Sequence, residues 1–556
     1  MSRPTPSRDT RTPRTAPGTP TRSRTRARTV AVTLGLVLTL GMGGAAGADS
    51  SAPDAALGRS IDRILADKRL AGASSSVVVS DAASGQVLYG HHSGTRLMPA
   101  SNTKLLTSAA AMDVLGPDYR YSTDVLARGT RHGGRLDGDL YVRGAGDPTL
   151  LAKDYDALAA KVAAAGIKKV TGSLVADDTR FDSQRLGASW AADDESAYYS
   201  SQISALSLAP DTDYDTGTVH LEVAPGAKAG DEPEVKVTPA NHYVKVKVTA
   251  TTVAENGSGT LSVDREHGGN TLTVSGGIPA GADPDESWTS VWEPTGYAAS
   301  VFADALREHG VRVAGKTELG RATPDAARKV AGHTSMPLAR LNFPFLKLSN
   351  NNHAEVLTKT MGYETAGEGT WGAGLRAVGD FLKKEGVDTG TLRQRDGSGL
   401  SRMNNVPAGQ MATLLHAVRS KPWFKEWYDA LPVACAPDRM TGGTLRSRMC
   451  GTPAEGNAHA KTGSLTGASA LSGYVTDAAG RQLAYSIILN NYVAPSVKDI
   501  ENSIVVALAS YGGDGNATAE DGGERDDRRR SPDAGPRPSG PATAGLECSW
   551  LKPAPC

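Results

Sequence analysis

Apolar residues recur at helical spacing over residues 55–70 and then give way to two short runs typical of β-strands. The helical period predicts a helix over the first segment. The two runs, 76–79 and 86–89, are joined by a turn-rich link of hairpin length and predict a β-hairpin. A second helix is predicted over 99–115, where Gly116 and the proline after it end the apolar pattern.

Residues 121–330 change character, because short β-like runs replace helical spacing over most of this region. Strands are predicted at 140–142, 174–176, 244–248 and 272–274. One clear helix is predicted at 155–165. We interpret 121–330 as a β-rich insertion, built as two subdomains.

Helical spacing returns after the insertion, and the chain closes on three strand-like runs and a final helix. The predicted helices are 297–308, 352–363, 375–384, 407–418 and 497–508, and the predicted strands are 458–464, 470–476 and 483–489. A helix and hairpin at the start, with strands and a helix at the end, indicate one sheet built from both parts. We therefore expect an α/β domain that is discontinuous, over 49–120 and 331–511.

The two ends of the chain differ from the region between them. Residues 1–30 hold eight Arg and one acidic residue, and an apolar run over 30–42 and small residues follow in the order of an export signal. We expect a signal peptide over 1–48 and a secreted, cell-wall-associated protein; an uncleaved membrane anchor and a disordered start remain alternatives. The apolar run is shorter than the roughly 20 residues of a membrane span, which favours cleavage. Residues 512–556 have almost nothing to bury and predict a disordered tail.

Charge and cysteine content exclude several classes of protein. The chain of 556 residues carries 60 Lys and Arg and 60 Asp and Glu, so its formal net charge is zero. A chain without excess positive charge has no general attraction for nucleic acid. Cys435 and Cys450 share one loop-like segment, and Cys548 and Cys556 lie near the C-terminus. Two local disulfides are the simplest pairing, although three pairings are possible. Neither pair has the spacing and histidines of a zinc site, so we expect no metal and no cofactor.

Ser101 and Lys104 are the first candidates for chemistry. They lie three residues apart at the start of a predicted helix, so their side chains share one face. A neutral amine beside a hydroxyl can take its proton. Taken alone, an N-cap serine with a solvated lysine explains the pair better, and the same spacing recurs at Ser549 and Lys552 in the tail.

Two further motifs favour a catalytic role for Ser101 and Lys104 over a structural one. Ser349-Asn350-Asn351 stands just before a predicted helix, and Lys461-Thr462-Gly463 lies in a strand-like run. Ser-x-x-Lys, Ser-x-Asn and Lys-Thr-Gly occur together, in this order, in penicillin-binding proteins and class A β-lactamases. Here the middle residue of the second motif is Asn350 rather than Asp, and only the outer two residues are expected to face the cleft.

With residues 146–150, 396–402 and 461–465, the chain resembles the D-alanyl-D-alanine carboxypeptidase/endopeptidase family over about residues 55–510. These are the class C, low-molecular-mass penicillin-binding proteins of the S13 peptidase type. The resemblance implies a penicillin-binding/β-lactamase-like transpeptidase fold, with an antiparallel sheet flanked by helices and interrupted by inserted subdomains. The long interval between Ser101 and Ser349 fits that family and argues against the compact class A β-lactamases.

The resemblance also implies a reaction through an acyl-enzyme. Ser101 would attack the D-Ala-D-Ala amide, with Lys104 as general base. A free lysine titrates near 10.4, so the site has to lower the pKa of Lys104. Desolvation and a second ammonium at Lys461 would both act in that direction. The backbone N–H groups of Ser101 and Ser464 are the expected oxyanion hole.

The remaining motif residues are expected to handle the leaving group and the substrate. Ser349 would relay a proton to the departing D-alanine, bridging Lys104 and Lys461, and Asn351 would bind the peptide side of the substrate. The terminal carboxylate would be received by Lys461, Thr462 and Ser464.

Four conspicuous residues are expected to have structural roles. His353 and His459 lie beside the second and third motifs, but a lone histidine in such a place usually packs. Asp147 and Asp396 lie in glycine-rich turns, where an aspartate commonly bonds its own backbone.

The expected partners are peptidoglycan stem peptides, and β-lactam antibiotics as covalent inhibitors. A membrane partner is expected only if the N-terminal apolar segment is retained. Two alternatives stay open: a β-lactamase or esterase on the same scaffold, and a catalytically silent wall-binding protein. Carboxypeptidase and endopeptidase action are not distinguished by the sequence.

Overall fold

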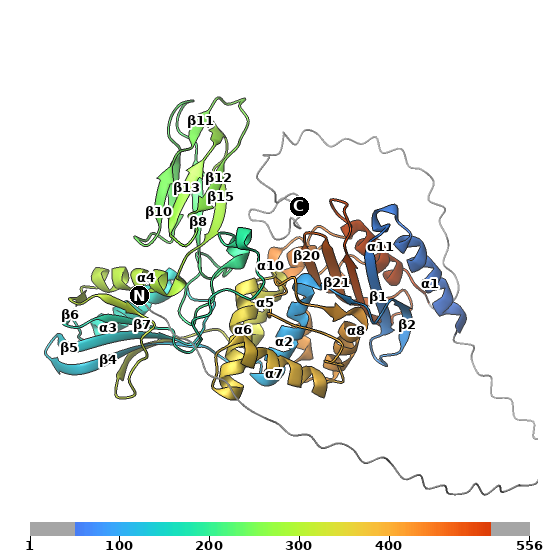
Figure 1. Ribbon diagram of the computed structural model, residues 1–556, viewed down its shortest axis with the longest axis horizontal. Helices are drawn as coiled ribbons and strands as arrows, with labels where there is room; N and C mark the ends of the chain where they lie inside the picture. The colour runs from blue at the N-terminus through green and yellow to red at the C-terminus, as the bar shows by residue number, and fades with distance from the viewer. Residues whose placement is uncertain (1–50, 513–556) are drawn as a thin grey trace, which may run out of the picture. The chain divides into compact units, whose positions relative to one another are not determined.

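A five-stranded antiparallel sheet joins the first and last parts of the chain in the computed structural model, which describes residues 51–512 (Figure 1). Its strand order is β2-β1-β22-β21-β20, so the first strands of the chain pair directly with the last. The strands are β1 (Ser74–Asp81), β2 (Val87–His91), β20 (His459–Leu465), β21 (Ala468–Thr476) and β22 (Gln482–Asn490). The expectation of one sheet built from both parts of the chain is confirmed.

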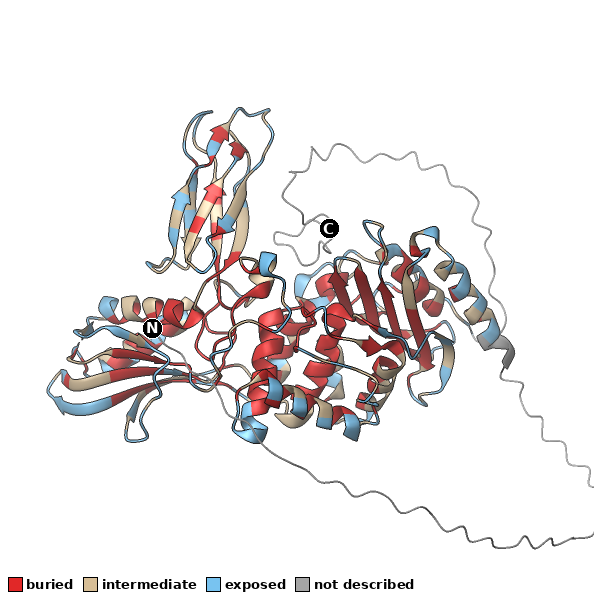
Figure 2. Ribbon diagram, viewed as in Figure 1, coloured by how far each residue is buried: buried red, intermediate tan, exposed pale blue. Residues whose placement is uncertain are grey.

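Both faces of this sheet are covered, so its central strands are buried along most of their length, their serines included (Figure 2). Val77 and Val79 of β1 pack with helices α1 (Ser51–Leu65) and α11 (Lys498–Ala509). Val78 points to the opposite face and packs against α8 (Ala408–Ala417). Further helices extend the core on the α8 side of the sheet: α2 (Thr103–Val114), α5 (Leu338–Lys347), α6 (Asn351–Ala366), α7 (Trp371–Lys384) and α9 (Phe424–Asp429).

The region between the two halves begins with a seven-stranded mixed sheet. Its members are β4 (Ser122–His132), β5 (Arg135–Gly144), β6 (Lys169–Val170), β7 (Leu174–Asp177), β16 (Arg312–Val313), β17 (Thr317–Leu319) and β18 (Arg328–Thr334). Helices α3 (Ala152–Ala164) and α4 (Pro294–Glu308) share one apolar core with this sheet. Because β18 pairs with β4 through Thr334, we propose that the insertion ends after this strand rather than at 330.

Shorter strands form the second part of the insertion, in sheets of two and three strands. They are β8 (Thr218–Ala224), β9 (Glu234–Thr238), β10 (Lys245–Val248), β11 (Thr251–Val253), β12 (Ser262–Arg265), β13 (Thr271–Ser275), β14 (Gly277–Pro279) and β15 (Asp285–Ser290). A final short pair, β3 (Arg96–Leu97) and β19 (Val406–Pro407), lies outside the insertion and joins the first and last parts of the chain. We propose that the two sets of sheets are the two expected subdomains.

Several local expectations need correction. The first helix ends at Leu65, and a separate 3₁₀ turn follows at Lys68–Leu70. The helix predicted from 99 begins as a 3₁₀ turn, η2 (Ala100–Asn102), before α2. The predicted signal peptide, residues 513–556 of the predicted tail, and Cys548 and Cys556 lie outside the described residues. Within 51–512, no helix combines the length and apolar character that crossing a bilayer requires.

Candidate active site

Ser101 lies in η2, at the point where the chain turns from the sheet edge into α2. The residue before it, Ala100, has a φ of 46°, a left-handed conformation that a residue with a side chain seldom adopts. Such strain is characteristic of functional turns, where the surrounding structure holds it in place. Ser101 is fully buried.

Lys104 lies on the first turn of α2 and contacts three oxygen atoms. Its Nζ is 2.7 Å from Ser101 Oγ, 2.6 Å from Asn351 Oδ1 and 2.9 Å from the Ser398 carbonyl. The amide and carbonyl oxygens can only accept, so they take two N–H bonds and leave the lone pair of a neutral amine for the serine hydroxyl. Burial and the nearby Lys461 ammonium hold the pKa of Lys104 well below its usual value, as the sequence predicted.

The second motif occupies the turn between α5 and α6. Ser349 has a φ of 60°, and its hydroxyl accepts a hydrogen bond from Lys461 Nζ at 2.8 Å. Asn351 faces Lys104 with its amide oxygen and donates its Nδ2 to the carbonyl of Tyr199. Asn350 points away and donates to the Asp213 carbonyl. The outer residues therefore face the site and the middle one does not, which explains how Asn can replace Asp there.

The third motif lies on β20, the terminal strand of the sheet, beside the Ser101 turn. Lys461 Nζ donates hydrogen bonds to the Ser349 hydroxyl and to the backbone carbonyl of the next residue, Thr462. A Cβ on Gly463 would come within 2.6 Å of the Pro99 carbonyl and 3.1 Å of Ser101 N, so only glycine lets the strand approach this closely. Ser464 follows on the same strand and is buried.

Two side chains that the motifs do not include hold this arrangement in place. The carboxylate of Glu355, on α6, accepts hydrogen bonds from Gly397 N, Ser398 N and Trp371 Nε1. It thereby fixes the turn whose Ser398 carbonyl receives Lys104. Burial, with the charge of Asp396 adding to it, raises the pKa of Glu355 to about 7.

Thr444 is the second. It lies in a 3₁₀ turn, η6 (Gly443–Leu445), directly after α10 (Arg439–Gly442), and its Oγ1 is 2.8 Å from Thr462 Oγ1. This segment is closed by the disulfide between Cys435 and Cys450, which confirms one of the two expected pairings. No motif marks Thr444. The two cysteines on either side of it were the only available signal.

The four residues expected to be structural make structural contacts. His353 is buried against the Tyr214 carbonyl, and desolvation lowers its pKa to about 3. His459 stacks on the Tyr428 ring at 4.4 Å, and its pKa falls to about 4, mainly through desolvation. Asp147 accepts from the backbone and hydroxyl of Thr149, and Asp396 bonds its own turn at Gly399 and Ser401.

The fold and the site together define a serine hydrolase of the penicillin-binding class, in which a serine and a lysine lie beside a Lys-Thr-Gly edge strand. The model of the D-Ala-D-Ala carboxypeptidase 3 (S13) family matches residues 57–511. The chain therefore belongs to this family, in agreement with the resemblance of its motifs.

Individual relatives agree. A D-alanyl-D-alanine carboxypeptidase of Actinomadura sp. (strain R39) is 44% identical over 500 residues, covering 89% of this chain and 90% of the relative. The carboxypeptidase DacB of Haemophilus influenzae is 28% identical over 419 residues, which are 75% of this chain and 85% of that protein. The crystal structure of penicillin-binding protein 4 (DacB) from H. influenzae superimposes with a TM-score of 0.71 at 26% identity, over 81% of this chain and 98% of that one.

Proposed function

We propose that this chain is a serine D-alanyl-D-alanine carboxypeptidase that cleaves peptidoglycan stem peptides through an acyl-enzyme on Ser101. One observation carries this proposal. Lys104 faces two acceptor-only oxygens and the Ser101 hydroxyl, in a site that favours its neutral form. That is the arrangement a general base for serine attack requires.

In the proposed acylation, Ser101 Oγ attacks the carbonyl carbon of the D-Ala-D-Ala bond while its proton passes to Lys104 Nζ. The backbone N–H groups of Ser101 and Ser464 hold the developing oxyanion. Ser349 passes its hydroxyl proton to the departing D-alanine amine and recovers the proton that Lys104 took from Ser101, so Lys104 is neutral again before deacylation. Breaking the C–N bond leaves the ester on Ser101 and free D-alanine.

In the proposed deacylation, water attacks the ester and Lys104 takes the proton of the water. That proton returns to Ser101 Oγ as the ester bond breaks, which restores the resting site and releases the shortened peptide.

Substrate binding is assigned to the edge strand and to the second motif. The terminal carboxylate would bind Lys461 and the hydroxyls of Thr462 and Ser464, and the amide of Asn351 would meet the peptide backbone. Both amide atoms of Asn351 have protein partners in the free enzyme, so substrate would have to share or replace one of them.

We also propose that β-lactams acylate Ser101, and that the enzyme acts outside the cytoplasm at the cell wall. The relative from H. influenzae has been solved in complex with a β-lactam, at 25% identity and a TM-score of 0.65 over 80% of this chain and 97% of that one. The export signal expected at 1–48 supports the location.

The direct test is release of D-alanine from an N-acylated peptide that ends in D-Ala-D-Ala. We expect the wild type to release it and Ser101→Ala to fail while retaining the same unfolding temperature. A peptide ending in D-Ala-L-Ala is the matched substrate control. Equal release by Ser101→Ala would overturn the assignment, and cleavage of a cross-linked peptide dimer would identify endopeptidase action in addition.

A further inference from the structure

The orientation of the Asn351 amide depends on a carbonyl of the insertion. Asn351 donates its Nδ2 to the Tyr199 carbonyl at 2.8 Å and accepts from Lys104 Nζ with its Oδ1. Because a carbonyl oxygen can only accept, Tyr199 selects the amide orientation that turns Oδ1 toward Lys104. The reverse orientation would set an N–H donor where Lys104 now donates. The position of the Tyr199 carbonyl therefore decides how the Lys104 amine is held.

Tyr199 belongs to a compact segment, residues 194–199. Ala197 N donates to the Asp194 carbonyl, and Tyr199 Oη donates to the Asp194 carboxylate at 2.8 Å. Because these two bonds close the segment on itself, we expect a displacement of one end to move the other.

A buried arginine in the second part of the insertion anchors this segment. Arg265 is the last residue of β12, and only 2% of its side chain is exposed. One of its terminal nitrogens donates to both the carbonyl and the carboxylate of Glu195, at 3.0 and 2.9 Å. The other donates to the carbonyls of Glu266 and Gly269, in the turn that follows β12. Arg265 therefore ties Glu195 to this turn.

Further donors of the insertion converge on Glu195. Ser290 on β15 donates its Oγ to the Glu195 carbonyl at 2.7 Å, and its backbone N donates to the Ser196 carbonyl. The carboxylate of Glu195 also accepts from Gly268 N and pairs with the exposed His267. A buried carboxylate is stable only when it is paired and hydrogen-bonded, and these partners meet that need. Glu195 is thus a point at which the insertion holds the segment.

The residues on either side of Asn351 are held elsewhere. Asn350 donates to the Asp213 carbonyl, and His353 Nε2 lies 3.0 Å from the Tyr214 carbonyl. These contacts keep the start of α6 in place when the compact segment shifts. Loss of its anchor should therefore turn the Asn351 amide without unfolding the second motif.

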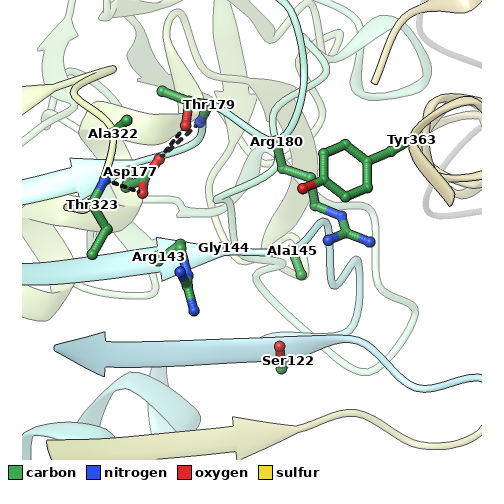
Figure 3. Close-up of a pocket in the computed structure, with 10 residues that line it drawn as sticks. All are labelled: Ser122, Arg143, Gly144, Ala145, Asp177, Thr179, Arg180, Ala322, Thr323 and Tyr363. Carbon is green, nitrogen blue, oxygen red and sulfur yellow. Dashed lines mark hydrogen bonds between the residues drawn. The ribbon is translucent and has the colours of Figure 1, made fainter. Parts of the chain in front are cut away.

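Another junction between the insertion and α6 lies near the opposite end of the helix (Figure 3). There Arg180 pairs with Glu364 and lies over the Tyr363 ring, 4.0 Å from its centre. Glu364 is about 20 Å along the helix from Asn351 at the usual rise per residue. This junction provides a matched comparison, because its loss should weaken the contact with the insertion without reaching the Asn351 amide.

We propose that Arg265 is a positioning residue for the acylation of Ser101. It acts through segment 194–199, which orients the Asn351 amide and, with it, the Lys104 amine. Its contribution is to the geometry of the site and not to the transfer of protons. This inference rests on the proposed acyl-enzyme, because it concerns the same reaction.

The test is the second-order rate of acylation by benzylpenicillin, followed by the mass of the intact chain. Arg265→Met should slow acylation by about tenfold, the value of one lost hydrogen bond to a positioned group. Arg265→Lys, which keeps a cation beside Glu195, should recover most of the lost rate. Arg180→Met is the matched control and should be acylated like the wild type. Equal slowing in Arg180→Met would show a general loosening of the insertion and would overturn the inference.

Repeating the measurement in Asn351→Ala separates positioning from general damage to the fold. Slow acylation of this variant can be followed by mass over hours. If Arg265 acts through the Asn351 amide, adding Arg265→Met should slow acylation by less than about twofold. A full effect in both backgrounds would show that the arginine acts by another route and would overturn the inference.

Ser290→Ala tests the same anchor if Arg265→Met does not fold. It removes one donor from the Glu195 carbonyl and spares the turn after β12, so acylation should slow by about threefold. An unchanged rate in Ser290→Ala would then overturn the inference. A wild type that forms no adduct would refute the proposed acyl-enzyme instead, so the two failures are distinguishable.

Discussion

Lys104 shows how a single residue acquires its chemistry from its surroundings. A solvated lysine is charged at neutral pH, but this one lies in the core beside a second ammonium. The spacing of Ser101 and Lys104 could be predicted from the sequence, and so could the direction of the pKa shift. Two oxygens orient the amine: the amide oxygen of Asn351 and the Ser398 carbonyl. The contact with the Ser398 carbonyl could not be predicted, because a backbone atom has no sequence signature.

The lowered pKa of Lys104 predicts the pH dependence of acylation. In the proposed mechanism the neutral amine is the active form, so the second-order rate of acylation by a β-lactam should rise with pH, by about tenfold per unit, and then level off. Because the pKa is lowered, the plateau should begin well below pH 10.5. A stopped-flow profile would check this. A rising limb centred near the pKa of a free lysine would show that Lys104 is not the base.

Thr444 predicts a separate effect on substrate binding. In the free enzyme its hydroxyl pairs with that of Thr462. In the proposed complex Thr462 donates to the carboxylate of the substrate, and Thr444 can then donate to Thr462. Thr444→Val removes that donor, so KM for the peptide should rise about threefold to tenfold, the value of one hydrogen bond, with kcat little changed.

Thr444→Ser, which keeps the hydroxyl, should restore KM. Thr413→Val on α8 is the control for loss of a threonine hydroxyl elsewhere. A fall in kcat at unchanged KM, or failure of serine to rescue, would exclude this positioning role.

At the scale of elements, the close contact between β20 and the Ser101 turn determines the geometry of the site. Gly463→Ala would place a methyl group against the Pro99 carbonyl and push the strand away from η2. A displacement of about 1 Å can cost roughly 10²-fold in rate, and we expect acylation to slow by that order. The rate of β-lactam acylation measures it directly.

Gly379→Ala is the matched control, since no atom lies within 4 Å of the added Cβ and the residue is inside α7. It should leave acylation unchanged and stabilise the fold by about 0.5–1 kcal/mol. Normal acylation by Gly463→Ala would mean that the strand and the turn are not rigidly coupled.

Elements with a clear apolar period were predictable whatever their length: the short strand β7 was predicted, whereas β4, with 11 residues, was missed. The apolar runs of β1, β21 and β22 and the helical spacing of α3, α6 and α7 gave clear signals. Helix α5 was missed because Pro344 lies inside it, and proline lacks the N–H that a helix interior uses. Helix α10 spans only Arg439–Gly442, too short for any period to be visible.

At the scale of the whole molecule, the site is assembled from parts that are far apart in sequence. Ser101 follows the first strands, the third motif lies on β20 near the end, and the Tyr199 carbonyl that accepts from Asn351 comes from the region between them. Motif order could be read from the sequence, and so could the insertion. The contribution of Tyr199 could not, because it is a backbone contact made by a loop without a motif.

The central claim is that Ser101 is an acylating nucleophile, and mass measurement of the intact chain after brief exposure to benzylpenicillin tests it most directly. The account predicts one adduct with the mass of the whole drug on the wild type and none on Ser101→Ala, because ring opening transfers the entire β-lactam to the serine. An adduct on Ser101→Ala, or an unmodified wild type with the drug left intact, would contradict it.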